Sequence, residues 1–122
     1  MGVLQRFERR LENLVQGAFT KAFRTDVQPV EIAAAIQREI DNNAQIVSRE
    51  RSLVPNDFVI ELGGHDHDRL SAYLGTLSTE LVDLARGHAD LQRYAFTGPV
   101  TVAFERHEDL GTGQFRVRSS VR

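Results

Sequence analysis

The feature that most constrains this chain is a change in the spacing of its apolar residues between Ile40 and Ile46. Before the change, apolar side chains recur at the helical period, on one stripe of each segment. After it, residues 58–62 and 100–105 alternate between apolar and polar side chains, which is the period of a strand with one buried face. Neither kind of element can bury its apolar face alone, so the helices and strands must pack on each other.

Helical spacing predicts two helices before the change and two after the first alternating strand. The first covers residues 4–23, with an apolar stripe on one side and Arg9 turned outward. Pro29 is placed at the first position of the second helix, where its missing N–H is not needed. The other two are expected between residues 66 and 88, the first of them capped by Asp66. The stripe of the first helix is expected to build the core, with partner binding as the alternative.

Four strands are expected. Residues 46–54 are irregular and typical of an edge strand, and residues 58–62 follow a turn at residues 55–57. The last two strands cover residues 100–105 and 115–121, joined as a hairpin. We therefore predict an α+β fold with one small, mostly antiparallel sheet of about four strands and helices packed on one face.

Composition is that of an ordinary globular domain, and residues 1–122 are expected to form one domain. The chain has no cysteine, which excludes disulfides, thiolate metal sites and cysteine nucleophiles and fits a reducing, cytoplasmic location. No apolar run is long enough to span a bilayer. The net charge of −2 argues against nucleic acid as a partner.

The segment Leu110-Gly111-Thr112-Gly113-Gln114-Phe115 presents one hydroxyl between two glycines. Glycine adopts positive φ angles without strain and removes bulk on either side of the threonine. A protein kinase needs an accessible hydroxyl in an extended or turn segment, so Thr112 is the candidate phosphorylation site. The alternative is a threonine that serves only the geometry of the turn.

Catalytic, cofactor and metal sites are all expected to be absent. His65-Asp66-His67-Asp68 is the one candidate for a metal or acid–base site, but Asp66 is better explained as the cap of a helix. His88 and His107 stand too far along the chain to extend it. No nucleophile elbow, phosphate-binding loop or dinucleotide fingerprint occurs, and Glu61 and Glu105 lie in no pattern that raises a carboxyl pKa. We therefore do not expect an enzyme.

Two pairs of arginines, Arg49 with Arg51 and Arg116 with Arg118, are spaced so that each pair shares one face of a strand. If those strands were neighbours, four guanidinium groups would gather and contact an acidic partner or a phosphate. We favour the simpler interpretation that they keep exposed positions of the sheet soluble. Two alternative functions follow from these patterns and from the exposed strand edges: a nucleic-acid-binding module and a homodimerisation domain.

Several segments also carry a resemblance to a known family. They are Pro29-Val30-Glu31-Ile32, Val54-Pro55-Asn56-Asp57-Phe58-Val59-Ile60-Glu61-Leu62, Asp66, Leu70, Gly98-Pro99-Val100, Phe104-Glu105 and the stretch from Leu110 to Arg118. Together with the long first helix they resemble the actinobacterial FhaA N-terminal domain family over essentially the whole chain. The Thr-Gly-Gln-Phe-Arg segment that starts at Thr112 is the most specific part.

The resemblance implies a non-catalytic cytoplasmic domain that opens a longer protein. In that family a disordered linker and a C-terminal forkhead-associated domain, which binds phosphothreonine, follow it; neither is present here, so the chain is expected to be an excised domain. The resemblance further implies a scaffold in serine/threonine kinase signalling that controls cell-wall synthesis and division. Its implied partners are the kinase and cell-wall synthesis proteins, and Thr112 matches the kinase acceptor.

Overall fold

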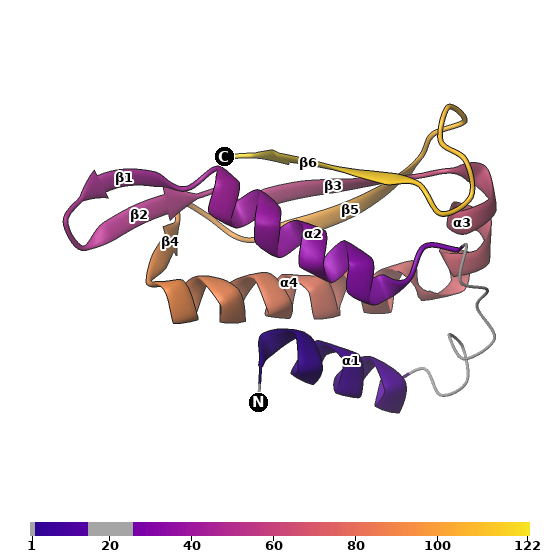
Figure 1. The fold of residues 1–122 in the computed structure, drawn as a ribbon, viewed down its shortest axis with the longest axis horizontal. Helices are drawn as coiled ribbons and strands as arrows, with labels where there is room; N and C mark the ends of the chain where they lie inside the picture. Colours follow the sequence, from indigo (N-terminus) through magenta and orange to yellow (C-terminus); the bar gives the residue numbers. More distant parts are fainter. Residues whose placement is uncertain (1, 15–25) are drawn as a thin grey trace.

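The computed structural model describes residues 2–14 and 26–122, in which blocks of helices and strands follow one another (Figure 1). The elements are α1 (Val3–Leu14), α2 (Pro29–Asn42), β1 (Gln45–Ser48), β2 (Arg51–Val54), β3 (Asp57–Leu62), α3 (Gly64–Leu70), a 3-10 turn (Ser71–Tyr73), α4 (Leu74–Gln92), β4 (Tyr94–Phe96), β5 (Thr101–Arg106) and β6 (Phe115–Ser120). The predicted α+β class is confirmed.

The two N-terminal helices bury the stripes that their spacing predicts. In α1 the buried side chains are Val3, Phe7 and Leu11, four residues apart along one face. The continuation predicted for residues 15–23 lies outside the described residues. Helix α2 begins at Pro29, as predicted, and its core-facing side chains include the fully buried Ile36.

Helices α3 and α4 were predicted, but both begin earlier than expected. Helix α3 starts at Gly64, with Gly63 at the N-cap position and no side-chain cap, so the prediction that Asp66 caps it is wrong. Helix α4 starts at Leu74, because the intervening 3-10 turn keeps the backbone helical, and Gly75 therefore lies inside it. The apolar face of α4 is buried along its length.

The strands form two separate three-stranded sheets instead of one sheet of four. We call β1-β2-β4 the hairpin sheet and β5-β3-β6 the central sheet. Both are mixed rather than mostly antiparallel: β2 pairs in parallel with β4, and β3 with β5, while β1–β2 and β3–β6 are antiparallel. The helical block α3–α4 separates the partners of each parallel pair, and such a crossover returns the chain in the same direction.

The hairpin sheet contains two departures from the predicted strands. The expected single edge strand is a hairpin, β1 and β2, that turns at Arg49 and Glu50. The short strand β4 was not predicted. A polar cluster connects it to the helices, since Asp41 of α2 accepts a hydrogen bond from the Tyr94 hydroxyl (2.9 Å) and contacts His88 Nε2 of α4 (2.9 Å). His88 is thereby a satisfied structural residue.

The core lies between one face of the central sheet and helices α2 and α4 (Figure 1). The sheet contributes Phe58, Ile60 and Leu62 of β3, all fully buried. Helix α2 packs along β6 and α4 packs along β5, while α1 packs against α2 and α4. In the part of the chain that the structure describes, no helix packs on the opposite face of the central sheet, which bears charged side chains such as Glu61, Arg116 and Arg118.

The last two strands do not form the predicted hairpin. Strands β5 and β6 lie on opposite sides of β3, so residues 107–114 must cross the end of the sheet where β3 finishes. The crossing is close: a Cβ atom added at Gly63 would clash with the carbonyl oxygen of Leu110 and come within 3.1 Å of that of Gly111. Gly63 is therefore required by the approach of two backbones, since its own φ of −67° suits any residue.

The crossing predicts opposite effects for two Gly→Ala substitutions. We expect Gly63→Ala to lower the free energy of unfolding by about 1–3 kcal/mol, because the loop must move away from the new methyl group. Gly75→Ala has open space around its Cβ and lies in a helix, so it should raise that free energy by about 0.5 kcal/mol. Urea denaturation of both variants measures the difference. Equal stability of Gly63→Ala and the wild type would show that the crossing is not tight.

Candidate functional site: the Thr112 loop and its anchor

Thr112 lies at the outer end of the crossing loop, with its side chain exposed. The amide of Gln114 donates to the carbonyl of Gly111 (3.1 Å), which closes a four-residue turn with Thr112 in second and Gly113 in third place. Gly113 has a φ of 83°, as the third position of a type II turn requires. The side-chain Oε1 of Gln114 also accepts from the Gly111 amide (2.9 Å). The hydroxyl is thus presented by a locally closed turn.

A buried carboxylate attaches this turn to the body of the fold. Oδ2 of Asp66 accepts the amide of Gly113 (2.8 Å), and Oδ1 accepts the amide of Val27 (3.0 Å), just before α2. Asp66 is fully buried, and Nη2 of Arg69 lies 3.4 Å from Oδ1. Its place in the first turn of α3 also sets the negative charge at the positive end of that helix. One side chain therefore joins three segments that are distant in sequence.

The candidate metal or acid–base segment, residues 65–68, takes part in this anchor. His65 Nε2 contacts Oδ1 of the buried Asp26 (3.1 Å), and Arg69 Nε lies 3.5 Å from its Oδ2. Asp26, His65 and Asp66 lie close enough to share a cation. However, both oxygens of Asp66 already accept backbone amides, and Arg69 contacts both carboxylates as their positive partner. This arrangement has the features of a hydrogen-bonded network that stabilises the fold, and not those of a cation site.

A second charged cluster lies on the face of the central sheet that points away from α2 and α4. Glu61 of β3 is nearly buried and accepts from Arg116 Nε (2.5 Å) and Arg118 Nε (2.7 Å) of β6. His107 Nε2 lies 2.9 Å from Glu105 Oε1 and 3.3 Å from Glu61 Oε2. The hydrogen bond from Arg116, and then that from Arg118, hold the pKa of Glu61 below its ordinary value. Hydrogen bonding to His107 lowers the pKa of Glu105 in the same way.

The two predicted arginine pairs lie in different parts of the fold and form no common patch. Arg116 and Arg118 both contact Glu61, whereas Arg51 belongs to the hairpin sheet. Arg49 lies in the turn before β2, so the strand spacing that would have put it on the face of Arg51 does not apply. The contact of either pair with a partner remains a prediction.

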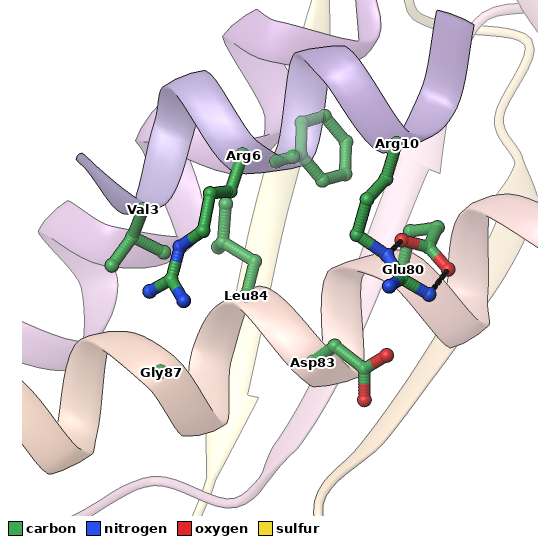
Figure 2. Close-up of a pocket in the computed structure, with 8 residues that line it drawn as sticks. Val3, Arg6, Arg10, Glu80, Asp83, Leu84 and Gly87 are labelled. Atoms are coloured by element: carbon green, nitrogen blue, oxygen red, sulfur yellow. Dashed lines mark hydrogen bonds and ion pairs between the residues drawn. The ribbon is translucent and has the colours of Figure 1, made fainter. Parts of the chain in front are cut away.

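A hollow of about 210 Å³ lies between α1 and α4, as Figure 2 shows. Val3 and Leu84 supply part of its apolar lining, and the buried Glu80 closes one side. Arg10 Nε donates to Glu80 Oε1 (2.7 Å), with Nη2 3.4 Å from Oε2. Because this ion pair satisfies Glu80, no buried acid among the described lining residues is left unpaired for a ligand. Its residues hold α1 on α4.

The sequence patterns indicated most of these residues as candidates, but they did not show which of them contact one another. Glu61 and Glu105 occupy outward positions of alternating strands, but their contact with His107 depends on β5 lying in parallel beside β3. The role of Asp66 was missed because a carboxylate in the first turn of a helix also suits a cap. Nothing in the local sequence indicates that its partners are the amides of Val27 and Gly113.

The anchor predicts that Asp66→Asn destabilises the fold by about 1–3 kcal/mol, because an amide nitrogen cannot accept the hydrogen bond that one carboxylate oxygen now accepts. Amide hydrogen exchange at Gly113 or Val27 should accelerate. Asp68→Asn is the matched control in the same helix, since Asp68 is exposed. Unchanged stability and unchanged protection of both amides in Asp66→Asn would contradict the anchor.

The Glu61 cluster predicts loss of stability in acid. Because the folded pKa values of Glu61, Glu105 and Asp109 lie below their ordinary values, their ionised forms stabilise the fold above about pH 4, and this contribution disappears as the pH falls through the folded values. The melting temperature should therefore fall less on acidification in Glu61→Gln than in the wild type. Glu8→Gln, at an exposed position of α1, should behave like the wild type. Parallel acid profiles for Glu61→Gln and wild type would refute this.

Comparisons with known proteins agree over nearly the whole chain. A family model described as "FhaA, N-terminal domain" matches residues 4–118. "FHA domain-containing protein FhaA" of Mycobacterium tuberculosis (strain ATCC 25618 / H37Rv) is 36% identical over 119 residues, which are 98% of this chain and 23% of that protein. A solved structure described as "Rv0020c_Nter structure" matches with a TM-score of 0.76 and 34% identity, covering 88% of this chain and 82% of that chain.

These matches extend to the fold as well as the sequence. The chain spans less than a quarter of the length of the curated relative, and neither printed description names an enzyme. Of the helices in the described ranges, none has the length and apolar content needed to cross a membrane. The family match includes all of the Thr112 loop and the anchor at Asp66. The chain therefore belongs to the FhaA N-terminal domain family.

Proposed function

We propose that this chain is a non-catalytic regulatory domain that a serine/threonine protein kinase phosphorylates at Thr112. The proposal extends to a scaffold role in the control of cell-wall synthesis and division. The observation that carries it is the exposed Thr112 hydroxyl on a turn whose base is held by Asp66 and Gln114. Membership of the family and the similarity to an FHA domain-containing protein support the signalling context.

The geometry of the turn suits a kinase substrate. Thr112 lies between two glycines, so the residues directly before and after it add no side chain beside its hydroxyl. The Gly113 amide, which donates to Asp66, and the close approach of the loop backbone to Gly63 attach the turn to the body of the fold. A kinase can therefore open the residues around Thr112 without unfolding the central sheet.

The charged clusters support a role outside catalysis. A general acid or base works best with a pKa near the operating pH, whereas arginine and histidine neighbours move the pKa values of Glu61 and Glu105 in the opposite direction, downward. The carboxylate of Asp66 accepts backbone amides and contacts Arg69. These acids therefore stabilise the fold.

A phosphate on Thr112 would act as a docking group for another protein. Of the two arginines of β6, Arg116 is the nearer to Thr112 in sequence, and it is already bound to Glu61 and Asp109. Arg118 is bound to Glu61 and Glu105. Capture of the phosphate by either arginine would have to break these ion pairs. The added charge of about −1.5 to −2 is thus left exposed for recognition by a partner.

Phosphorylation in vitro tests the proposal. The chain is incubated with an actinobacterial transmembrane-type serine/threonine kinase and its phosphorylated residues are mapped by mass spectrometry. We expect one dominant site at Thr112 and loss of most incorporated phosphate in Thr112→Ala, because the other exposed threonines of the described residues, Thr79, Thr97 and Thr101, lie in a helix, a short link and a strand.

Thr79→Ala provides the matched control, since Thr79 is exposed but helical and its hydroxyl donates to the Gly75 carbonyl. It should be phosphorylated as fully as the wild type. If Thr112→Ala accepts as much phosphate as the wild type, Thr112 is not the acceptor.

A further inference from the structure

The hairpin end of the molecule carries arginines that the fold does not neutralise. A hollow of about 580 Å³ lies between the β1–β2 turn and the C-terminal end of α4. Its lining includes Ile46, Arg49, Arg51, Ser52, Gln92 and Arg93. Three guanidinium groups thus border one concave surface, and among its described lining residues Glu50 is the one acid.

These three arginines differ from most others in the described ranges. Arg10, Arg69, Arg106, Arg116, Arg118 and Arg122 each lie within ion-pair distance of a carboxylate. No such pair involves Arg49, Arg51 or Arg93 in the part of the chain that the structure describes. The negative, C-terminal end of the α4 dipole stabilises the positive charge of Arg93, but it does not explain the charges of Arg49 and Arg51. The chain as a whole has a net charge of −2, so the excess is local.

Exposed apolar side chains also lie at the hairpin end, and one of them, Ile46, lines the hollow. Ile46 and Val47 of β1 are 83% and 54% exposed, and Leu91, which precedes the lining residue Gln92 in sequence, is 67% exposed. All four residues of β1 are exposed, so this strand has no covered face. Exposed aliphatic side chains of this size next to unpaired arginines mark an interaction surface.

We propose that the hairpin end, defined by Arg49, Arg51, Arg93, Ile46 and Val47, docks on an anionic lipid bilayer. The guanidinium groups bind lipid phosphates, and the aliphatic side chains enter the boundary between headgroups and acyl chains. A soluble phosphate would explain the arginines but would leave Ile46 and Val47 without a role. Addition of a peptide strand fits less well, because β1 is four residues long and its pairing is irregular between Ile46 and Ser48.

The shape of the molecule suits this surface. The β1–β2 hairpin projects at one end of the long axis, and the loop between β5 and β6 lies at the other end (Figure 1). Docking through the hairpin therefore needs no change in the core and leaves the Thr112 loop facing away from the lipid. The proposal is independent of whether Thr112 is phosphorylated.

Vesicle co-sedimentation tests the proposal. The chain is mixed with vesicles of phosphatidylcholine alone and with vesicles of equimolar phosphatidylcholine and phosphatidylglycerol. We expect binding to the anionic vesicles only, weakening as salt is added. Arg49→Gln, Arg51→Gln and Arg93→Asn combined should weaken it about a hundredfold, since each arginine near an anionic surface contributes about fivefold. Asparagine is used at position 93 because φ there is 61°.

Two further variants separate this surface from net charge. Arg9→Gln, Arg38→Gln and Arg86→Gln combined remove the same charge outside the hollow and should leave binding within about twofold. Ile46→Ser with Val47→Ser should weaken binding while keeping its dependence on salt. Circular dichroism melts check that each variant is folded.

The proposal is overturned by any of three results: no binding of the wild type to anionic vesicles, equal loss in the two triple-arginine variants, or full competition by millimolar inorganic phosphate. It is also overturned if the surface instead binds a phosphopeptide with the same arginine dependence and no vesicles. Concentration-dependent dimerisation that Ile46→Ser abolishes would assign the surface to a second copy of the chain.

Discussion

The buried carboxylate of Asp66 is the contact on which the arrangement of the other parts depends. It accepts amides from Val27 and Gly113, and Arg69 contacts it as well. Burying a charge is tolerated only when hydrogen bonds and an opposite charge replace water, and here they do. As a result, the start of α2, the first turn of α3 and the crossing loop are held at one end of the central sheet.

Charge is distributed differently at the two ends of this elongated fold. Around the Thr112 loop and on the uncovered face of the central sheet, arginines are matched by acids such as Glu61 and Asp109. At the hairpin end, Arg49 and Arg51 have no such match in the described ranges. Paired charges stabilise a fold, whereas unpaired ones next to exposed aliphatic side chains are available to a partner. The two ends therefore suit two different roles.

Local patterns predicted the elements better than their pairing. Pro29 marked the start of α2 because the first position of a helix needs no N–H, and the alternation ending at Leu62 marked β3. The predicted hairpin between the last two strands was wrong. Two alternating segments joined by a glycine-rich loop have the same sequence pattern whether they pair with each other or lie on either side of a third strand. Arg49 was assigned to a strand because its neighbours favour β-structure, although it lies in a turn.

By itself, the sequence determined the α+β class, the family and the exposure of Thr112, because these follow from apolar periodicity, motif similarity and glycine chemistry, which are local properties. Only the tertiary structure decided that the sheets are mixed, that Asp66 is an anchor and that Arg93 joins Arg49 and Arg51 around one hollow. Each of these depends on segments separated by some forty residues or more along the chain. Their contacts arise from the packing of α2 and α4 on the central sheet, which no local pattern encodes.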